Sequence, residues 1–162
     1  MELLPLDLKN LWSPNFVQTK DMKYGISEEP KAREAYTNAT GNKVHTTGLW
    51  VNKFSFLAAS PDGLVTENGK SIIIEIKCLK LLRELSVEEL VQQCKDGKIS
   101  SDVLNRQCFK VVDGKLILRQ SHMYYFQVQM LLLVTDFDVC NFVLHSHKGH
   151  PSVQQILRYE KC

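Results

Sequence analysis

The segment "KSIIIEIK" (residues 70–77) constrains the fold most, because it is as apolar as a buried strand yet contains two charges near its end. It follows Asn68-Gly69, the dipeptide that most strongly favours a two-residue hairpin turn. Residues two apart in a strand share a face, so each face has its own set: Ile72, Ile74 and Ile76 on one, and Ile73, Glu75 and Lys77 on the other. The sequence therefore predicts a buried strand with a carboxylate and an ammonium group side by side.

Helical and strand patterns alternate along the rest of the chain. One helix is expected with Ser27 as its N-cap and Gly41 at its end, and a second from the capping box of Ser86 and Glu89 to Gly97. The other expected elements are a β region over 44–76, a hairpin turning at Asp113-Gly114, a helix over 121–135 that is apolar on nearly all faces as a fully buried helix would be, a strand over 137–145 and a strand over 152–161. This order predicts an α/β fold with a central mixed β-sheet flanked by helices.

Composition argues against several classes of protein. The chain has 162 residues, 44% of them apolar and 23% charged, and its net charge of +2 does not suit a polybasic nucleic-acid coat. Five scattered cysteines without a CxxC spacing argue against a disulfide framework or a zinc ribbon and favour a reducing intracellular compartment. The N-terminus lacks a signal-peptide pattern, and polar residues interrupt the most apolar segment, so no membrane span is expected. We expect an irregular lead-in over residues 1–23 and a single domain over 24–162.

An isolated acid, Asp62 in "SPDG", lies thirteen residues before Glu75. Folding back the hairpin brings Asp62 alongside Glu75 and Lys77. Two neighbouring carboxylates repel each other unless a cation lies between them, and Mg²⁺ takes oxygen ligands of this kind. The pattern therefore indicates a metal site where Lys77 orients a water or steadies the charge on a phosphate. The spacing alone leaves open an edge strand with Glu75 and Lys77 on its solvated side and Asp62 as a turn residue.

Two further polar residues fall on apolar helical stripes. Glu29 lies three residues before Ala32 on the stripe of the first helix, so it is expected to face inward; alternatively, Glu28 and Glu29 only complement the helix dipole. Gln127 shares a stripe with Tyr124 in the apolar helix, and a glutamine there must find a polar partner. A core glutamine that is hydrogen-bonded to the backbone would also explain it.

Four motifs in this order resemble a known family: "YGISEEPKAREAY", "SPDGLV", "IIEIKC" and "HMYYFQVQMLLLVT". They are similar to the YqaJ-like viral recombinase domain, in the lambda-exonuclease branch of the PD-(D/E)xK nuclease superfamily. The resemblance extends over about residues 24–144 and implies a restriction-endonuclease-like core.

The resemblance also implies a role for each matching position. The implied catalytic residues are Lys77, Glu75, Asp62, Glu29 and Gln127. The implied metal ligands are Asp62, Glu75, the backbone carbonyl of Ile76 and, through a water molecule, Glu29. The implied substrate-binding residues are Tyr124, Ser60 and Arg33. Lys80, just after the strand, could also contact backbone phosphates, and a solvated helix face or loop explains it equally well.

The activity implied by the resemblance is hydrolysis of DNA phosphodiesters that depends on Mg²⁺, for which Mn²⁺ substitutes. The expected substrate is linear duplex ends, and the implied partners are a homo-oligomer, a trimer by family analogy, and a single-strand annealing protein. The expected location is intracellular, cytoplasmic or nuclear depending on the host.

The chain also departs from the family pattern. Only residues 1–23 precede the first motif, with Lys9, Lys20 and Lys23 as candidates for gripping a 5′-phosphate end, and Cys162 comes early. We therefore expect either a trimmed or degenerate copy, or a chain in which the ring-forming and end-selecting parts were lost. Two alternatives stay open: a non-catalytic DNA-binding or scaffold domain that keeps the fold, and an endonuclease with the same chemistry.

The segment "HSHKGH" places His145, His147 and His150 close together in sequence. Imidazoles at this spacing could bind zinc. The favoured interpretation is a polar loop after a strand.

Overall fold

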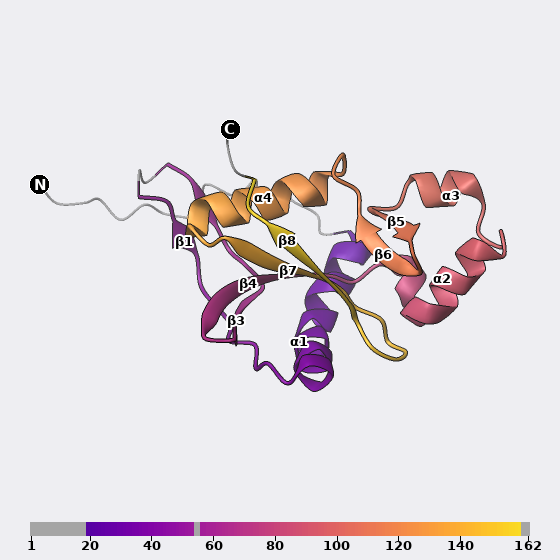
Figure 1. Ribbon diagram of the computed structural model, residues 1–162, viewed down its shortest axis with the longest axis horizontal. Helices are drawn as coiled ribbons and strands as arrows, with labels where there is room; N and C mark the ends of the chain where they lie inside the picture. The colour runs from indigo at the N-terminus through magenta and orange to yellow at the C-terminus, as the bar shows by residue number, and fades with distance from the viewer. Residues whose placement is uncertain (1–18, 54–55, 160–162) are drawn as a thin grey trace, which may run out of the picture.

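The computed structural model describes residues 19–53 and 56–159, and its core is a four-stranded sheet in the order β3-β4-β7-β8 (Figure 1). Two separate pairs, β1-β2 and β5-β6, complete the described strands. The helices are α1 (Lys20–Thr40), α2 (Val87–Lys95), α3 (Ser101–Asn105), α4 (Met123–Thr135) and the short 3-10 helix η2 (Lys80–Leu82). The strands are β1 (Trp50–Val51), β2 (Ala58–Ala59), β3 (Gly63–Glu67), β4 (Lys70–Lys77), β5 (Phe109–Val112), β6 (Lys115–Leu118), β7 (Val139–Leu144) and β8 (Ser152–Leu157).

The sheet is mixed, as the sequence predicts. β3 and β4 form an antiparallel hairpin whose turn has positive φ at both Asn68 and Gly69, as a primed two-residue turn requires. β4 then pairs in parallel with β7, which pairs antiparallel with β8. β4 is therefore an internal strand, and the alternative of an edge strand with a solvated charged side is wrong. Glu75 is only 1% exposed.

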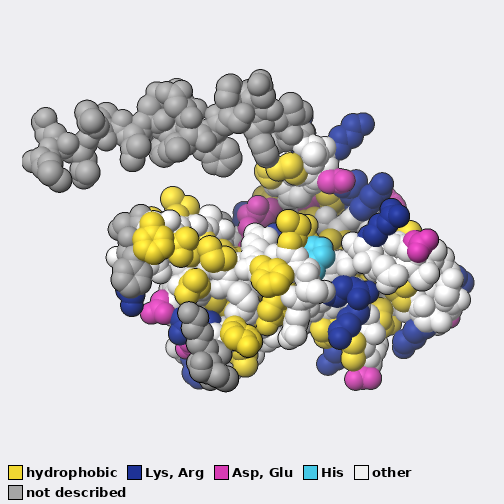
Figure 2. All heavy atoms as spheres, turned by 90° about the horizontal axis from the view of Figure 1, so that it is seen from above, with side chains coloured by type: hydrophobic (Ala, Val, Ile, Leu, Met, Phe, Trp, Pro, Cys, Tyr) yellow, Lys and Arg dark blue, Asp and Glu magenta, His cyan; other side chains and the backbone are white. Residues whose placement is uncertain are grey.

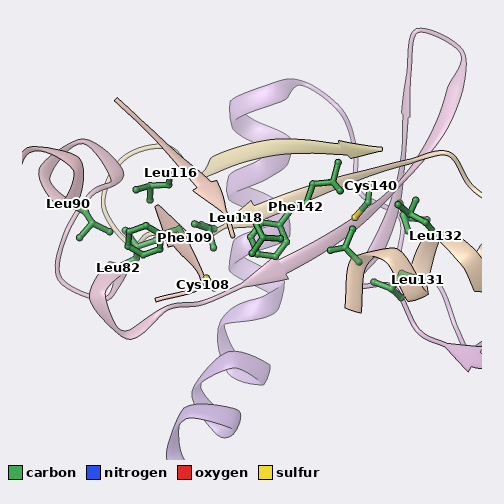
Figure 3. Close-up of a cluster of buried hydrophobic side chains, with 14 of the residues drawn as sticks. Leu82, Leu90, Cys108, Phe109, Leu116, Leu118, Leu131, Leu132, Cys140 and Phe142 are labelled. Atoms are coloured by element: carbon green, nitrogen blue, oxygen red, sulfur yellow. The ribbon is translucent and has the colours of Figure 1, made fainter. Parts of the chain in front are cut away.

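The two faces of β4 belong to different apolar clusters, which confirms the alternation expected from the sequence. On one face, isoleucines of β4 pack against Ala32 and Tyr36 of α1. On the other, Ile73 joins a larger cluster that includes Phe142 of β7 and residues of α2, α4, β5 and β6 (Figure 3). The sheet thus lies between α1 and α4 (Figure 1). Charged residues near the end of β4 are enclosed by these layers.

α1 begins earlier than the sequence predicts. Its N-cap is Thr19, whose hydroxyl accepts a hydrogen bond from the Met22 backbone N–H, whereas Ser27 lies inside the helix. Pro30 lacks a backbone N–H and usually disfavours a helix interior, but packing of α1 against the sheet maintains the helix across it. The end at Gly41, with φ of 76°, is confirmed. Residues 20–23 are helical rather than irregular, and residues 1–18 of the expected lead-in lie outside the described residues.

α4 is not buried on all sides. Val128, Leu131 and Leu132 face the core, while its outer side leaves a row of large apolar side chains exposed: Met123, Phe126, Met130 and Leu133. Hydrophobic side chains gather on the face of the molecule that contains α4 (Figure 2). Uniform hydrophobicity gave no periodic signal for the side that faces the sheet. Among the described residues, no helix is long and apolar enough to cross a membrane.

A buried polar network fastens α1 to the sheet. The Tyr36 hydroxyl donates to Glu67 Oε1 over 2.9 Å, and Asn141 Nδ2 donates to both the Tyr36 hydroxyl and that same carboxylate oxygen. Burial, followed by the hydrogen bond to Glu67, raises the pKa of Tyr36 to about 12, so the phenol stays protonated as a donor. The network therefore joins α1, β3 and β7 at one point.

Replacing Tyr36 by phenylalanine should lower the free energy of unfolding by about 1–2 kcal/mol, because the part-buried Glu67 carboxylate loses one of its donors and the buried Asn141 amide loses an acceptor while the ring packing is kept. Urea denaturation measures the change. Tyr125→Phe is the matched control, since no hydrogen bond of the Tyr125 hydroxyl is present in the described part of the chain, and it should change stability by less than about 0.5 kcal/mol. Equal losses in both variants would contradict a stabilising role for this network.

Candidate active site

The C-terminal end of β4 opens into a cleft of about 370 Å³ between α1 and the start of α4. Its lining includes five of the residues that the sequence singles out: Glu29, Asp62, Ile76, Lys77 and Tyr124. Three larger cavities, of about 410, 510 and 670 Å³, lie on the β5-β6 side and contain none of the predicted site residues. The chemistry of the lining, rather than the size of the cavity, therefore identifies the candidate site.

Glu75 lies at the centre of the site. Its Oε1 accepts hydrogen bonds from Lys77 Nζ over 2.5 Å and from Gln127 Nε2 over 2.7 Å. Its Oε2 is buried and has no hydrogen-bond partner among the described residues. Burial raises the pKa of Glu75 to about 7, with the neighbouring charge of Asp62 acting in the same direction and Lys77 opposing it. A buried carboxylate oxygen is thus left without a donor.

Asp62 lies directly before β3, next to β4. Its Oδ2 accepts a hydrogen bond of 2.7 Å from the backbone N–H of Ile76, which ties the start of one strand to the end of the other. Burial raises the pKa of Asp62, against the opposing effects of this hydrogen bond and of Lys77. The hairpin has therefore brought Asp62 alongside the Glu75–Lys77 pair, as expected from the sequence.

Lys77 is held as a cation between two partners. Besides its bond to Glu75, its Nζ lies 4.7 Å from the centre of the Tyr124 ring, within range of a cation–π contact. Burial lowers the pKa of Lys77, but the carboxylates of Glu75 and Asp62 outweigh this effect and raise it overall. The ammonium group therefore stays charged beside the two acids.

Glu29 lines the cleft from α1 and pairs with Arg33, one turn further along the helix. Arg33 also donates to the backbone carbonyl of Asp62 over 3.3 Å. The helix-dipole alternative assumed that α1 starts at Ser27; with the start at Lys20, Glu29 lies well inside the helix, beyond the first turn where the dipole acts. Glu29 therefore faces the cleft and does not complement the helix dipole.

The other predicted residues differ in their placement. Gln127 is exposed rather than a core glutamine, and only its amide reaches in to Glu75. Ser60 and Lys80 are exposed and do not line the cleft. Of the candidates for an end-binding role, Lys20 and Lys23 are exposed in the first turn of α1, and Lys9 lies outside the described residues.

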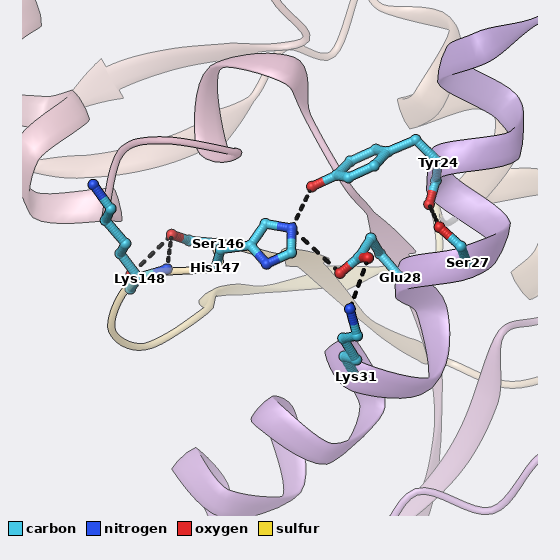
Figure 4. Close-up of polar contacts among 7 residues, drawn as sticks. All are labelled: Tyr24, Ser27, Glu28, Lys31, Ser146, His147 and Lys148. Atoms are coloured by element: carbon cyan, nitrogen blue, oxygen red, sulfur yellow. Dashed lines mark hydrogen bonds and ion pairs between the residues drawn. The ribbon is translucent and has the colours of Figure 1, made fainter.

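Glu28, which the sequence analysis considered only as an acid that complements the helix dipole, is buried next to the cleft without lining it. It is 7% exposed, its Oε1 accepts from Lys31 Nζ over 3.0 Å, and its Oε2 lies 3.2 Å from His147 Nε2 (Figure 4). The spacing in the sequence could have predicted that Glu28 is buried. Glu28 lies one turn before Ala32 and two turns before Tyr36, the two buried apolar residues of α1. The hydrogen bond from Lys31 lowers the pKa of Glu28, so this buried acid is ionised.

A hard divalent cation fits the residues of the cleft. Asp62 and Glu75 supply carboxylate oxygens, one of which is buried without a donor among the described residues, and Lys77 is the positively charged side chain that bonds Glu75. Magnesium-type ions are bound in proteins by one or two carboxylates and waters. The donor set is therefore that of an oxygen-ligated metal site.

Comparison with known proteins adds two findings. The model of the YqaJ-like viral recombinase domain matches residues 7–138. No curated protein matches the chain in sequence.

Solved structures are similar to this chain over most of its length. The crystal structure of LHK-Exo in complex with dAMP is 25% identical with a TM-score of 0.57, over 88% of this chain and 60% of that one. An alkaline exonuclease, LHK-Exo from Laribacter hongkongensis, is 24% identical with the same TM-score, over 88% of this chain and 61% of that one. The α/β fold with a restriction-endonuclease-like core is confirmed, and the chain spans about three fifths of the length of these structures.

Gly63 is required beside Asp62, because a Cβ atom there would lie 2.4 Å from Val44 Cγ1 and 2.9 Å from Ile74 Cγ2. Gly63→Ala should therefore force β3 away from β4 and lower the free energy of unfolding by about 1–3 kcal/mol. The control Gly48→Ala adds a methyl group in open space and should change stability by less than about 0.5 kcal/mol. Chemical denaturation compares the two; an unchanged Gly63→Ala variant would show that the close packing at Gly63 is not needed.

Proposed function

The chain belongs to the YqaJ-like viral recombinase domain family, and from this premise we propose that it is a metal-dependent deoxyribonuclease that hydrolyses phosphodiesters at linear duplex DNA ends. The observation that supports this most directly is the convergence of Asp62, Glu75 and Lys77 at the end of β4: Asp62 and Lys77 line the cleft, and the buried Glu75 is bonded to Lys77 and keeps one oxygen without a donor among the described residues. A non-catalytic domain that only keeps the fold has no need for this costly burial of charge. The complete set of groups therefore favours catalysis over a scaffold role.

Mg²⁺ is the proposed ion, with Mn²⁺ as a substitute, and Asp62, Glu75 and the Ile76 carbonyl would hold it, with Glu29 acting through water. When bound, such an ion polarises a phosphoryl oxygen and eases deprotonation of water. The protein's own part is to hold the carboxylates in place and to oppose the effect of burial, which raises the pKa of both Asp62 and Glu75. The backbone N–H of Ile76 and the ammonium of Lys77 do this for Asp62 and Glu75 respectively.

Lys77 orients the attacking water and stabilises negative charge that develops on the phosphate. Its Nζ is held between the Glu75 carboxylate and the Tyr124 ring, so little reorganisation is needed as the charge grows. Gln127 donates to the same Glu75 oxygen as Lys77, from the exposed surface of α4, where a substrate can approach. Arg33, Tyr124, Ser60 and Lys80 are the proposed substrate contacts.

The proposed preference for DNA ends is supported by the family likeness and by the exposed lysines at the start of α1. Lys20 and Lys23 are exposed in the first turn of α1, close in sequence to residues of the cleft such as Met22 and Gly25. Cations there suit a terminal 5′-phosphate. A trimer and an annealing partner stay predictions of the family analogy.

The purified chain should degrade linear duplex DNA with 5′-phosphate ends in the presence of Mg²⁺ or Mn²⁺, and EDTA should abolish this. Asp62→Asn and Lys77→Met should each lower the rate at least about 100-fold, because each removes a group that stabilises transition-state charge. Glu34→Gln, which changes an exposed acid on the same helix as Glu29, is the control and should keep full activity. The rate of release of acid-soluble nucleotides is the measurement.

Closed circular duplex DNA, assayed in parallel, distinguishes the two modes of cutting. An exonuclease leaves it intact, whereas an endonuclease with the same residues linearises it. Folded wild-type protein that binds DNA but leaves every substrate whole with either ion would replace the nuclease proposal by the binding-domain alternative.

Mg²⁺ should also stabilise the folded chain without any substrate. At a concentration about tenfold above its dissociation constant, binding adds about 1.4 kcal/mol, or about 3–6 °C in Tm for a chain of this size. The Asp62→Asn variant should have the same Tm with Mg²⁺ as with EDTA, while Glu34→Gln should show the same rise in Tm as the wild type. Differential scanning calorimetry measures the shift; an equal response of the Asp62 variant would place the ion elsewhere.

A further inference from the structure

A second group of metal-binding side chains lies outside the active-site cleft. One ligand atom from each of Glu28, His145 and His147 lies within 4.8 Å of the others, and none of these residues lines the cleft. Glu28 comes from α1, and the two histidines lie two residues apart just after β7. His150, the third histidine of the same segment, is exposed and does not belong to the group. The polar loop expected from the sequence thus contains two histidines placed against a helix.

Two of the three side chains are buried with unpartnered polar atoms. His145 is 5% exposed, and in the described part of the structure neither of its ring nitrogens has a hydrogen-bond partner. Glu28 Oε2 likewise accepts no hydrogen bond, although it lies 3.2 Å from His147 Nε2, within ion-pair distance; Lys31 donates to the other oxygen. Buried polar atoms are normally satisfied, so unpartnered donors and acceptors that face one another call for a ligand.

The spacing of the atoms suits a small cation. Metal–ligand distances of about 2.0–2.1 Å place two ligands of a tetrahedral Zn²⁺ site about 3.3 Å apart. Glu28 Oε2 and His147 Nε2 are already separated by 3.2 Å (Figure 4). Only a modest approach of the His145 ring is needed to complete a three-ligand set, which leaves a fourth position for water.

The backbone holds the two histidines in place before any ion binds. The backbone N–H of His145 donates to the Lys77 carbonyl over 3.0 Å, and that of His147 to the Leu82 carbonyl over 3.3 Å. Between them, the Ser146 hydroxyl donates to the Leu85 carbonyl over 2.8 Å. The His147 side chain is 34% exposed, which gives an ion access from solvent. Such preorganisation reduces the ordering that binding requires.

We propose that Glu28, His145 and His147 form a binding site for a first-row transition-metal ion, with Zn²⁺ as the ion that fits best. Two imidazole nitrogens favour Zn²⁺ and its neighbours, whereas the oxygen-only set of the cleft favours Mg²⁺. The two sites therefore select different ions. An ion here would join α1 to the segment after β7, immediately beside Glu29, and so would fix the helix that supplies that acid to the cleft.

Binding of a metal ion at this site would break one hydrogen bond of His147. The Tyr24 hydroxyl is 2.7 Å from His147 Nε2, the same nitrogen that lies nearest to Glu28 (Figure 4). An ion must displace it from this nitrogen. Tyr24→Phe removes that competitor, so this variant should bind the ion at least as tightly as the wild type.

Zn²⁺ binding to the metal-free 162-residue chain, measured by competition with a chromophoric chelator, tests the proposal. The expected result is one ion per chain, with affinity at least about tenfold weaker in Glu28→Gln and in His147→Ala. His147 is partly exposed, so this variant folds even if changes at the buried His145 do not. Substitution with Co²⁺ should give visible bands of a tetrahedral site without a thiolate charge-transfer band.

His150→Ala and Asp62→Asn are the matched controls, one for a neighbouring exposed histidine and one for the nuclease cleft. Both should bind Zn²⁺ as the wild type does, so the outcome does not depend on whether the proposed nuclease activity is found. Affinity unchanged by Glu28→Gln and His147→Ala, or equally weakened by His150→Ala, would overturn the proposal. A thiolate band with Co²⁺ would do the same, by placing the ion at a cysteine.

Discussion

The burial of Glu75 in an internal strand is the constraint on which the site depends. A carboxylate in this position is stable only with partners, and the fold supplies Lys77 two residues along the same strand and the Gln127 amide from α4. These donors satisfy one oxygen and leave the other without a hydrogen bond. Three parts of the fold surround this single buried group. β4 supplies the Lys77 ammonium, α4 supplies the Gln127 amide, and the hairpin places the charge of Asp62 alongside.

α1 places two adjacent acids in two different environments. Successive helical residues point about 100° apart, so Glu29 lines the cleft while Glu28 packs against His147. Both positions depend on the docking of the helix, which the network of Tyr36, Glu67 and Asn141 fixes at its other end. The same helix therefore connects the proposed nuclease site with the histidine pair after β7.

Several features of the fold followed from local sequence signals. Both Asx-Gly turns, the capping box of α2 and the alternation along β4 are as expected, because turn chemistry and a period of two are properties of short segments. The start of α1 and the exposed side of α4 were not predicted from the sequence. Thr19 lies in a stretch without periodicity, and α4 is too uniformly apolar for its sequence to specify which side is covered.

By itself, the sequence determined the strand with its acid and base, the turn that folds Asp62 back to it and the family likeness, since all of these lie in contiguous motifs. Only the tertiary structure decided that β4 is internal, that Gln127 reaches Glu75 from an exposed position, and that Glu28 meets His145 and His147. These contacts join residues from about 50 to about 120 positions apart in the chain. They depend on how helices dock against the sheet, which no local pattern specifies.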